Sequence, residues 1–293
     1  MIPFILFFLK YPLVNNVSNS LSYNSKIQFF KKDFKSKKVK ILIMGSSFSL
    51  NNLHPNPLLD FYNTNEYINL SSWGQNMEII YTNLRYFNKK FNIEHLIINS
   101  GVPDFLNSRQ NINFNKVEKY LSGEITFPSL RRQDLKNYID HVKYKNNQFN
   151  YNSLIFDEYG TVILPKNGFE IDLRRWNGAY GDTFKEKLED INDNQLIYLD
   201  SIAIFCNSNN IQFIYVNNPY RDSFLYLQDT SAIVNYNIFQ LTIDSILQYH
   251  NAENIKTNNE SWPDSLFNDI SHMNIYGAIK LSNHIVNHLE TEK

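Results

Sequence analysis

The sequence predicts an α/β fold in which a parallel sheet carries helices on both faces. Three apolar runs, rich in β-branched and aromatic residues and bounded by polar ones, have the composition of buried parallel strands. These runs lie at 39–45, 95–101 and 211–218, and a shorter fourth strand is expected at 67–72. Apolar side chains at helical spacing fill 77–91, 194–210 and 278–290. This alternation of strands and helices is typical of βαβ units.

Length and composition agree with one large globular unit. The chain has 293 residues, of which 43% are hydrophobic and 15% aromatic, so it can bury a large core. Lys and Arg number 28 against 29 Asp and Glu, which gives a formal net charge of -1. No excess of positive charge attracts the chain to a phosphate backbone, so no nucleic-acid partner is expected. The composition does not predict an oligomeric state.

Cysteine usage argues against a metal site or a disulfide. The single cysteine, Cys206, lies in the apolar run YLDSIAIFC, which predicts a buried structural thiol. With one cysteine the chain can form no intrachain disulfide and no C-x-x-C metal motif, so we expect neither a metal nor another cofactor.

The predicted organisation is an N-terminal apolar segment and linker, 1–37, followed by an α/β domain, 38–293. The first 14 residues are strongly apolar, but Lys10 and Pro12 interrupt them before the roughly 20 residues that a spanning helix needs. They also lack the basic start and cleavage site of a secretory signal. A short membrane anchor, a hydrophobic arm packed on the domain and a targeting peptide all stay open. We therefore expect membrane association through the N-terminus or a periplasmic location, with the cytoplasm as the alternative.

The segment 107–185 breaks the βαβ pattern and is predicted to be an insertion or lid within the α/β domain. It is polar, aromatic and rich in turn residues, with a hairpin expected around Tyr159 and Gly160. Its motif RRWNGAY supplies candidate substrate-binding side chains that can stack on a glycan and hydrogen-bond to it. These are Arg174, Arg175, Trp176 and Tyr180. A surface loop anchored by one buried tryptophan is the alternative.

The first predicted strand runs directly into the small polar sequence Gly45-Ser46-Ser47. In a parallel sheet, ligands and reactive groups collect beyond the carboxyl ends of the strands, so these serines are placed for chemistry. A helix that starts here can stabilise an anion with its free N–H groups. The alternative is that Ser46, Ser47 or Ser49 only caps that helix.

A second pair of reactive residues, Asp269 and His272, stands before the last predicted helix. At this spacing the carboxylate can accept from the Nδ1–H of the imidazole, which leaves Nε2 free to take a proton from a serine. A solvated turn is the alternative for an isolated D-x-x-H. The order of strand, serine and late D-x-x-H favours nucleophilic chemistry.

Taken together, these blocks resemble the SGNH, or GDSL-like, hydrolase superfamily. MGSSFS is similar to the nucleophile block, with Ser46 in place of the usual aspartate, and NLSSWGQN and NDISHMNIYGA are similar to the second and last blocks. The resemblance covers about 39–105 and 190–289. It implies a flavodoxin-like three-layer α/β/α fold, with Ser47 as nucleophile, His272 as base and Asp269 as its orienting partner. It also implies that the backbone N–H groups of Ser47 and Gly74 bind the oxyanion.

One block departs from the family pattern. NSGVPDF aligns Gly101 and Asp104 with G-x-N-D, but Pro103 stands where the family has an oxyanion-binding asparagine. Proline has neither a side-chain donor nor a backbone N–H, so a third donor must come from elsewhere. The candidates are Asn76, Asn99 and Gln75.

The whole pattern looks most like SGNH-type proteins of bacterial surface-polysaccharide loci. That resemblance implies a serine esterase or O-acyltransferase that acts on ester groups of a carbohydrate through an acyl-Ser47 intermediate. One alternative, motivated by Pro103, is a non-catalytic SGNH-like protein that binds glycan or takes part in polysaccharide assembly. Another is a phosphate-binding α/β protein in which Gly45 and Ser46 form an anion nest.

Overall fold

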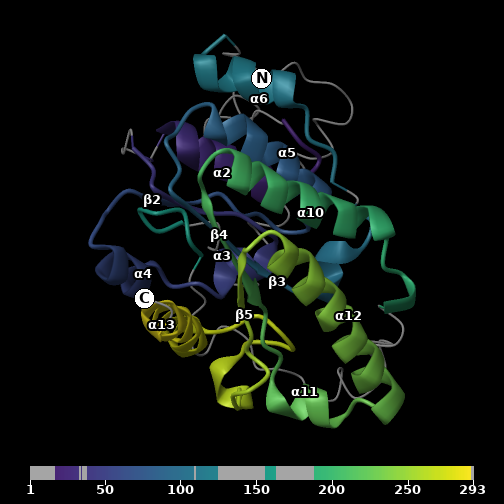
Figure 1. Ribbon diagram of the computed structural model, residues 1–293. Coiled ribbons are helices and arrows are strands. Elements are labelled where there is room, and N and C mark those ends of the chain that lie inside the picture. The colour runs from purple at the N-terminus through teal and green to yellow at the C-terminus, as the bar shows by residue number, and fades with distance from the viewer. Residues whose placement is uncertain are drawn as a thin grey trace, which may run out of the picture. The chain divides into compact units, whose positions relative to one another are not determined.

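The computed structural model describes residues 17–32, 34, 38–108, 110–124, 156–162 and 188–291 (Figure 1). The chain divides into two compact units, of which the first comprises Met1–Lys35 with Arg109–Gly160 and the second Ser36–Ser108 with Thr161–Lys293. The organisation predicted from the sequence differs from this grouping. It places the segment 107–185 within the α/β domain and treats 1–37 as a separate segment.

The second unit contains a five-stranded, wholly parallel sheet in the order β2-β1-β3-β4-β5. The strands are β1 (Ile41–Ile43), β2 (Tyr67–Asn69), β3 (His95–Ser100), β4 (Gln212–Asn217) and β5 (Glu253–Ile255). The register places Ile41 opposite Tyr67 on one side and His95 on the other. This is the flavodoxin-like strand order, so the predicted fold class is confirmed. Four of the five strands lie where the sequence predicts them.

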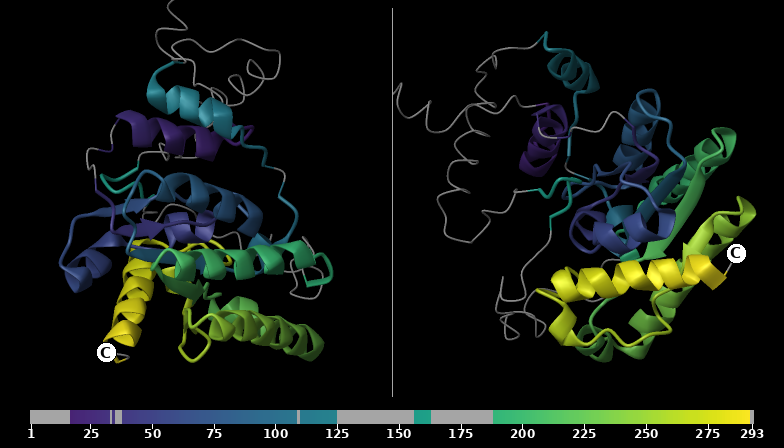
Figure 2. Two further views of the ribbon diagram at one scale, coloured as in Figure 1. Left: turned by 45° about the horizontal axis from the view of Figure 1, so that its top comes forward. Right: turned by 90° about the vertical axis from the view of Figure 1, so that its left-hand side faces the viewer.

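Helices cover both faces of the sheet (Figures 1 and 2). On one face, α10 (Asp193–Ser208) packs between α5 (Met77–Asn88) and α12 (Thr230–Tyr249). On the other, α13 (Ile275–Thr291) packs against α4 (Pro55–Tyr62), next to the short α3 (Ser47–Asn51). The shorter helices are η1 (Val102–Phe105), α11 (Asp222–Tyr226) and η2 (Asp264–Leu266). The helices predicted from 77–91, 194–210 and 278–290 are α5, α10 and α13.

The core lies between the sheet and these helices. All three residues of β1 are fully buried, as are Leu96, Ile97 and Ile98 of β3. Cys206 on α10 is also fully buried, and burial raises the pKa of its thiol to about 12. The predicted structural thiol is therefore confirmed.

The sequence did not predict α12 or β5, and the structure gives the reason. Apolar residues lie all around α12: Phe239, Ile243 and Leu247 are buried, whereas Ile238 and Leu241 are more than half exposed. A helix with apolar residues on every side has no clear periodicity. Strand β5 has only three residues, two of them polar, and therefore lacks the apolar run that marks the other strands.

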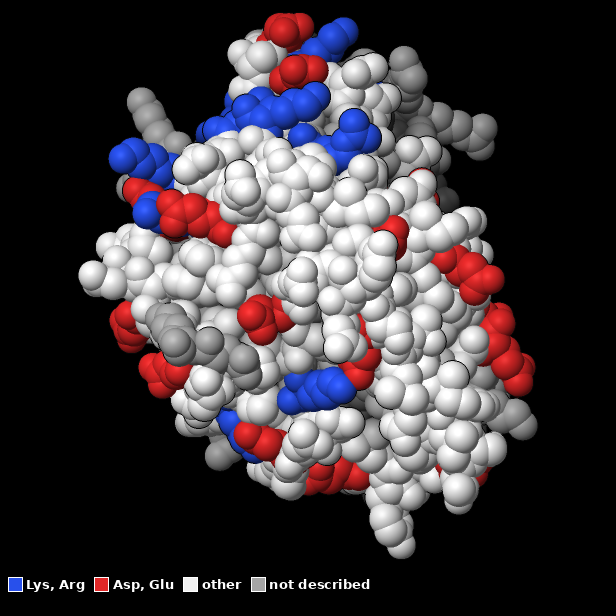
Figure 3. Space-filling view, viewed as in Figure 1, with Lys and Arg blue, Asp and Glu red and all other residues white. Residues whose placement is uncertain are grey.

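The face that α10 and α12 present carries few positive charges. Neither helix contains Lys or Arg, and Figure 3 shows this side of the molecule mostly white over both of them.

The first unit contains α2 (Leu21–Lys32) and α6 (Phe114–Ser122), which contact each other. Lys26 on α2 is almost fully buried, and burial holds the pKa of its amine well below the usual value. Its ammonium group donates to the carbonyl of Gly160 and lies 4.1 Å from the ring centroid of Phe156. A turn is present where the sequence predicts a hairpin, because the N–H of Gly160 donates to the carbonyl of Asp157.

The apolar N-terminal stretch, 1–16, lies outside the described residues. Among the helices that the structure does describe, none combines the length and the hydropathy needed to cross a membrane.

Candidate active site

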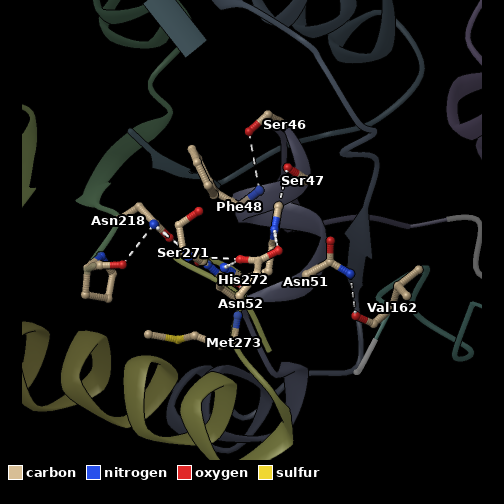
Figure 4. Close-up of polar contacts among 12 residues, drawn as sticks. Ser46, Ser47, Phe48, Asn51, Asn52, Val162, Asn218, Ser271, His272 and Met273 are labelled. Carbon is tan, nitrogen blue, oxygen red and sulfur yellow. Dashed lines mark hydrogen bonds and ion pairs between the residues drawn. The ribbon is translucent and has the colours of Figure 1, made fainter. Parts of the chain in front are cut away.

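Ser47 is the first residue of α3, directly after the turn that ends β1 (Figure 4). Gly45 makes this turn with a φ of +146°, and a Cβ there would lie 2.3 Å from the Oγ of Ser49. Only glycine fits that position without displacing α3. The Oγ of Ser46 caps the helix by accepting from the N–H of Phe48 at 3.3 Å. Capping is therefore the role of Ser46, and it leaves the Ser47 side chain available.

A chain of hydrogen bonds joins Ser47, His272 and Asp269. The Nε2 of His272 lies 2.7 Å from the Oγ of Ser47, and its Nδ1 lies 2.6 Å from the Oδ2 of Asp269. The other oxygen of Asp269 accepts from the backbone N–H groups of Ser271 at 2.9 Å and His272 at 2.7 Å. Both side chains are about one-third exposed, at 29% for His272 and 34% for Asp269. The imidazole is thus fixed at both nitrogens and still open to a substrate.

The pKa values of this pair respond to each other. Burial alone lowers the pKa of His272, but the charge of Asp269, its hydrogen bond and the charge of Asp104 outweigh burial, so the pKa lies above its usual value. Burial alone raises the pKa of Asp269, but the charge of His272 and three hydrogen bonds outweigh it, so that pKa is lowered. Asp269 therefore stays ionised and stabilises the imidazolium that forms when His272 takes a proton.

Asn52 holds the loop that carries His272 (Figure 4). Its Nδ2 donates to the carbonyl of Ser271 at 2.8 Å and to the Oδ1 of Asn218 at 2.7 Å. Its Oδ1 accepts from the N–H of Met273 at 2.8 Å. Asn52 follows α3 directly, so one buried side chain ties the nucleophile helix to the backbone on both sides of His272. No sequence signal points to this role, since an asparagine after a short helix is common at helix ends.

Gly74 lies in the loop after β2, at the same edge of the sheet. The N–H of Ser72 donates to the carbonyl of Gly45 at 3.1 Å, which holds this loop beside the nucleophile turn. Gly74 has a φ of +72°, and its carbonyl accepts from the hydroxyl of Ser108 at 2.9 Å. In the described part of the chain, the backbone N–H groups of Ser47 and Gly74 have no hydrogen-bond acceptor. Both are therefore available to an oxyanion.

Two of the side chains predicted as oxyanion donors make hydrogen bonds within the fold. Asn99 in β3 is fully buried, and its amide donates to the carbonyl of Phe48 at 3.1 Å and to Asn218 at 3.0 Å. Asn76 caps α5 by accepting from the N–H of Ile79, and its amide lies 3.5 Å from the carbonyl of Leu106. Both hydrogens of the Asn99 amide are therefore engaged within the fold, whereas an oxyanion role for Asn76 stays a prediction.

Gln75 differs from both asparagines. It is 1% exposed, and within the described residues neither its Oε1 nor its Nε2 has a hydrogen-bond partner. A buried amide without partners is costly, so this one calls for an explanation. Of the three predicted candidates, Gln75 is the one whose amide makes no hydrogen bond among the described residues.

Asp104 is a site residue that sequence reasoning did not single out. It lies in η1 beside Pro103, and its carboxylate is almost completely buried. Burial raises its pKa to about 7, and the hydrogen bond from the Gly101 N–H and the charge of His272 limit this rise. The feature of the sequence that could have drawn attention to Asp104 is its alignment with the aspartate of the G-x-N-D block.

The predicted substrate-binding residues Arg174, Arg175, Trp176 and Tyr180 lie outside the described residues. His284 and His288 on α13 do have H-x-x-x-H spacing, but Nδ1 and Nε2 of His284 contact Glu260 and the carbonyl of Lys256 at 2.8 and 2.9 Å. No group of three or more potential metal ligands is found in the part of the chain that the structure describes.

Comparison with known proteins gives only distant similarities. No family model and no curated protein sequence matches the chain. The esterase EstA from Pseudoalteromonas sp. is 11% identical with a TM-score of 0.40, and the match covers 87% of this chain and 98% of that one. A GDSL-like lipase from Bacteroides thetaiotaomicron is 10% identical with a TM-score of 0.44, covering 92% and 99% of the two chains. A lipase/acylhydrolase from Enterococcus faecalis is 14% identical with a TM-score of 0.39, covering 87% and 96%.

Proposed function

We propose that this protein is a serine esterase or O-acyltransferase that acts on ester groups of a carbohydrate through an acyl-Ser47 intermediate. The observation that supports it is the hydrogen-bonded chain from the Oγ of Ser47 through His272 to Asp269, at 2.7 and 2.6 Å. These three groups supply a nucleophile, a base and an orienting carboxylate at the carboxyl edge of a parallel sheet.

The chemistry follows from the two nitrogens of His272. Nε2 takes the hydroxyl proton of Ser47 as Oγ attacks the ester carbonyl, and a tetrahedral oxyanion forms. The N–H groups of Ser47 and Gly74 donate to that oxyanion, with the Gln75 amide as the third donor in place of the missing asparagine. The imidazolium then returns its proton to the departing alcohol, which leaves an acyl ester on Ser47. Water or a sugar hydroxyl, deprotonated by Nε2, releases the acyl group.

The carbohydrate part of the proposal rests on the sequence. The RRWNGAY motif offers aromatic and cationic side chains suited to sugar rings and hydroxyls, and it lies in the segment that interrupts the α/β pattern. A glycan-binding protein without catalysis is the second candidate. Pro103 favours this second candidate. In the family that the sequence resembles, this position carries the asparagine that donates to the oxyanion, and proline offers no such donor.

A fluorophosphonate probe separates these two candidates, since it reacts only with an activated serine. We expect the full-length protein to be labelled, Ser47→Ala not to be labelled, and Ser122→Ala, a change at an exposed serine of α6, to be labelled like the wild type. Binding of an acetylated oligosaccharide without any labelling would instead establish the non-catalytic function.

A comparison of two substrates tests the carbohydrate part of the proposal. Release of acetate from 4-nitrophenyl acetate and from an acetylated oligosaccharide is measured in wild type and Trp176→Ala. We expect Trp176→Ala to raise KM for the oligosaccharide and to leave the small ester nearly unchanged. Equal losses on both substrates would contradict a role of this motif in glycan binding. Adding an unacetylated oligosaccharide as acceptor then distinguishes transfer from hydrolysis.

A further inference from the structure

A cavity of about 290 Å³ lies at the carboxyl ends of β4 and β5. Its wall is formed by Asn217, the last residue of β4, by α12, and by the segment that directly follows β5. Helix α12 packs beside β5 (Figure 1). We call this cavity the β4–β5 pocket. Its volume is at the lower end of the range of small-molecule sites, so it suits a small ligand.

A buried amide oxygen in the β4–β5 pocket lacks a hydrogen-bond donor. Asn217 is 5% exposed, and its Nδ2 donates to the Oδ1 of Asn254 at 3.0 Å. Its own Oδ1 has no hydrogen-bond partner among the described residues. Since an unsatisfied buried acceptor is costly, this oxygen calls for a ligand that donates a hydrogen bond. A hydroxyl or an N–H can do so, whereas an ionised phosphate or carboxylate cannot.

The charges in the β4–β5 pocket neutralise each other. Asp244 on α12 and Lys256 after β5 both line it and form an ion pair, and they are its only charged lining residues. A bound anion would face the carboxylate of Asp244, and a bound cation would face the ammonium group of Lys256. Because like charges close together are costly, the pocket favours a neutral ligand.

The other lining residues offer hydrogen bonds and a small apolar surface. Asn237 and Asn258 are exposed, and their amides, each able to donate and to accept, have no hydrogen-bond partner in the described part of the chain. The ring of Tyr236 and the side chain of Leu241 add apolar contact area from α12. A small neutral ligand with several hydroxyls and an apolar C–H face matches this lining, and a sugar residue has these properties.

The β4–β5 pocket lies at the same edge of the sheet as the nucleophile. The ring of Tyr236 lies 6.1 Å from the ring of Tyr220. A Cβ at Gly101 would lie 2.9 Å from the hydroxyl of Tyr220 and 3.0 Å from the ring of Phe48, which follows Ser47. The strands β1, β3, β4 and β5 are neighbours in that order, so the ends of β4 and β5 lie on the order of 10–15 Å from the end of β1. An extended ligand can therefore reach both places.

We infer that the β4–β5 pocket binds one neutral sugar residue, with a sugar hydroxyl donating to the Oδ1 of Asn217. The binding itself does not depend on the chemistry of Ser47. Assigning the bound sugar to the glycan that carries the ester rests on the proposed function. The pocket then holds one unit of the glycan while another unit presents its ester to Ser47.

NMR titration of the full-length protein tests the binding without turnover. The neutral probes are the methyl glycosides of glucose, galactose and N-acetylglucosamine, and the charged probes of similar size are glucuronic acid and glucosamine. We expect at least one neutral probe to cause saturable shifts at the backbone amides of Asn217, Thr257 and Asn258, in wild type and in Ser47→Ala alike. The charged probes should bind on the order of tenfold more weakly. The absence of saturable shifts with all three neutral probes, or equal binding of the charged ones, would overturn the inference.

Neighbouring asparagines of α12 provide a matched pair of variants. Asn237 lines the β4–β5 pocket, whereas Asn235 is exposed on the same helix and does not line it. We expect Asn237→Ala to raise the Kd of the neutral probe about fivefold, the usual effect of losing one hydrogen bond, and Asn235→Ala to leave it unchanged. Asn217→Leu should raise the Kd on the order of tenfold. If that variant does not fold, Asn258→Ala takes its place, and an unchanged Kd in both Asn237→Ala and Asn258→Ala would overturn the inference.

Kinetics connect the β4–β5 pocket to the reaction. KM for an acetylated oligosaccharide should rise about fivefold in Asn237→Ala and stay at the wild-type value in Asn235→Ala. Saturable sugar binding by a protein that hydrolyses no ester would contradict the proposed function and support the pocket. Ester hydrolysis by a protein whose pocket binds no neutral sugar would overturn the inference and leave the proposed function standing.

Discussion

The Nε2 of His272 lies 2.7 Å from the Oγ of Ser47, although 225 positions of sequence separate the two residues. Ser47 is placed by the turn that ends β1, and His272 by the loop before α13. The parallel sheet brings these places together, because the carboxyl ends of its strands all lie at one edge. The imidazole is thus set to remove the proton of that hydroxyl.

The first prediction follows from this contact. Ser47→Ala and His272→Ala should each lower kcat for ester hydrolysis by a comparable factor, on the order of 10⁴ or more, since the two groups act as a unit. The double variant should lose little more than either single variant. Initial rates on 4-nitrophenyl acetate measure this, with thermal unfolding as a check on the fold. If Ser47→Ala keeps the wild-type rate, Ser47 has no catalytic function.

The second prediction concerns Asp269. In Asp269→Asn the imidazole loses the carboxylate that raises its pKa, so the pKa of His272 should fall. A base with a lower pKa stays unprotonated at lower pH, and the acidic limb of kcat/KM should therefore move to lower pH. We also expect a lower kcat, by a smaller factor than in Ser47→Ala, because the amide favours the wrong tautomer. A limb displaced to higher pH would contradict the proposed role.

Sequence reasoning reached most of the fold and the three side chains that hydrogen bonds join, Ser47, His272 and Asp269, because both depend on local patterns. The apolar runs of β1 to β4 and the blocks around Ser47 and His272 are readable in short windows. By contrast, the roles of Asn52, Asn99 and Asp104 depend on which backbone groups lie opposite them across the fold. Asn99 illustrates this: its amide suits an oxyanion, but Phe48 and Asn218 already occupy it. No spacing in the sequence reveals such a partner.

The third prediction separates Gln75 from Asn99. Since Gln75 has no hydrogen-bond partner among the described residues, Gln75→Met should leave thermal stability nearly unchanged and lower kcat on the order of 10²-fold, the usual effect of removing one oxyanion donor. Asn99→Leu should instead lower the unfolding temperature, because it removes buried hydrogen bonds. Full kcat in Gln75→Met would show that the amide does not bind the oxyanion.

The last prediction is the pH dependence of stability that Asp104 imposes. Its folded-state pKa of about 7 lies above the ordinary value of 3.8, so the native state holds this proton more tightly than the unfolded chain does. Its contribution to stability is therefore complete below about pH 4 and is lost as the pH rises to about 7. Between pH 5 and pH 8 the carboxyl should lower the free energy of unfolding by on the order of 2–3 kcal/mol.

Asp104→Asn removes the ionisable group, so its stability relative to wild type should be higher at pH 8 than at pH 5. Urea unfolding of both proteins at the two pH values measures this difference, with Asp60→Asn, a change at an exposed carboxylate of α4, as the control. If the difference in unfolding free energy between Asp104→Asn and wild type does not change with pH, folding does not raise the pKa of Asp104, and the prediction is wrong.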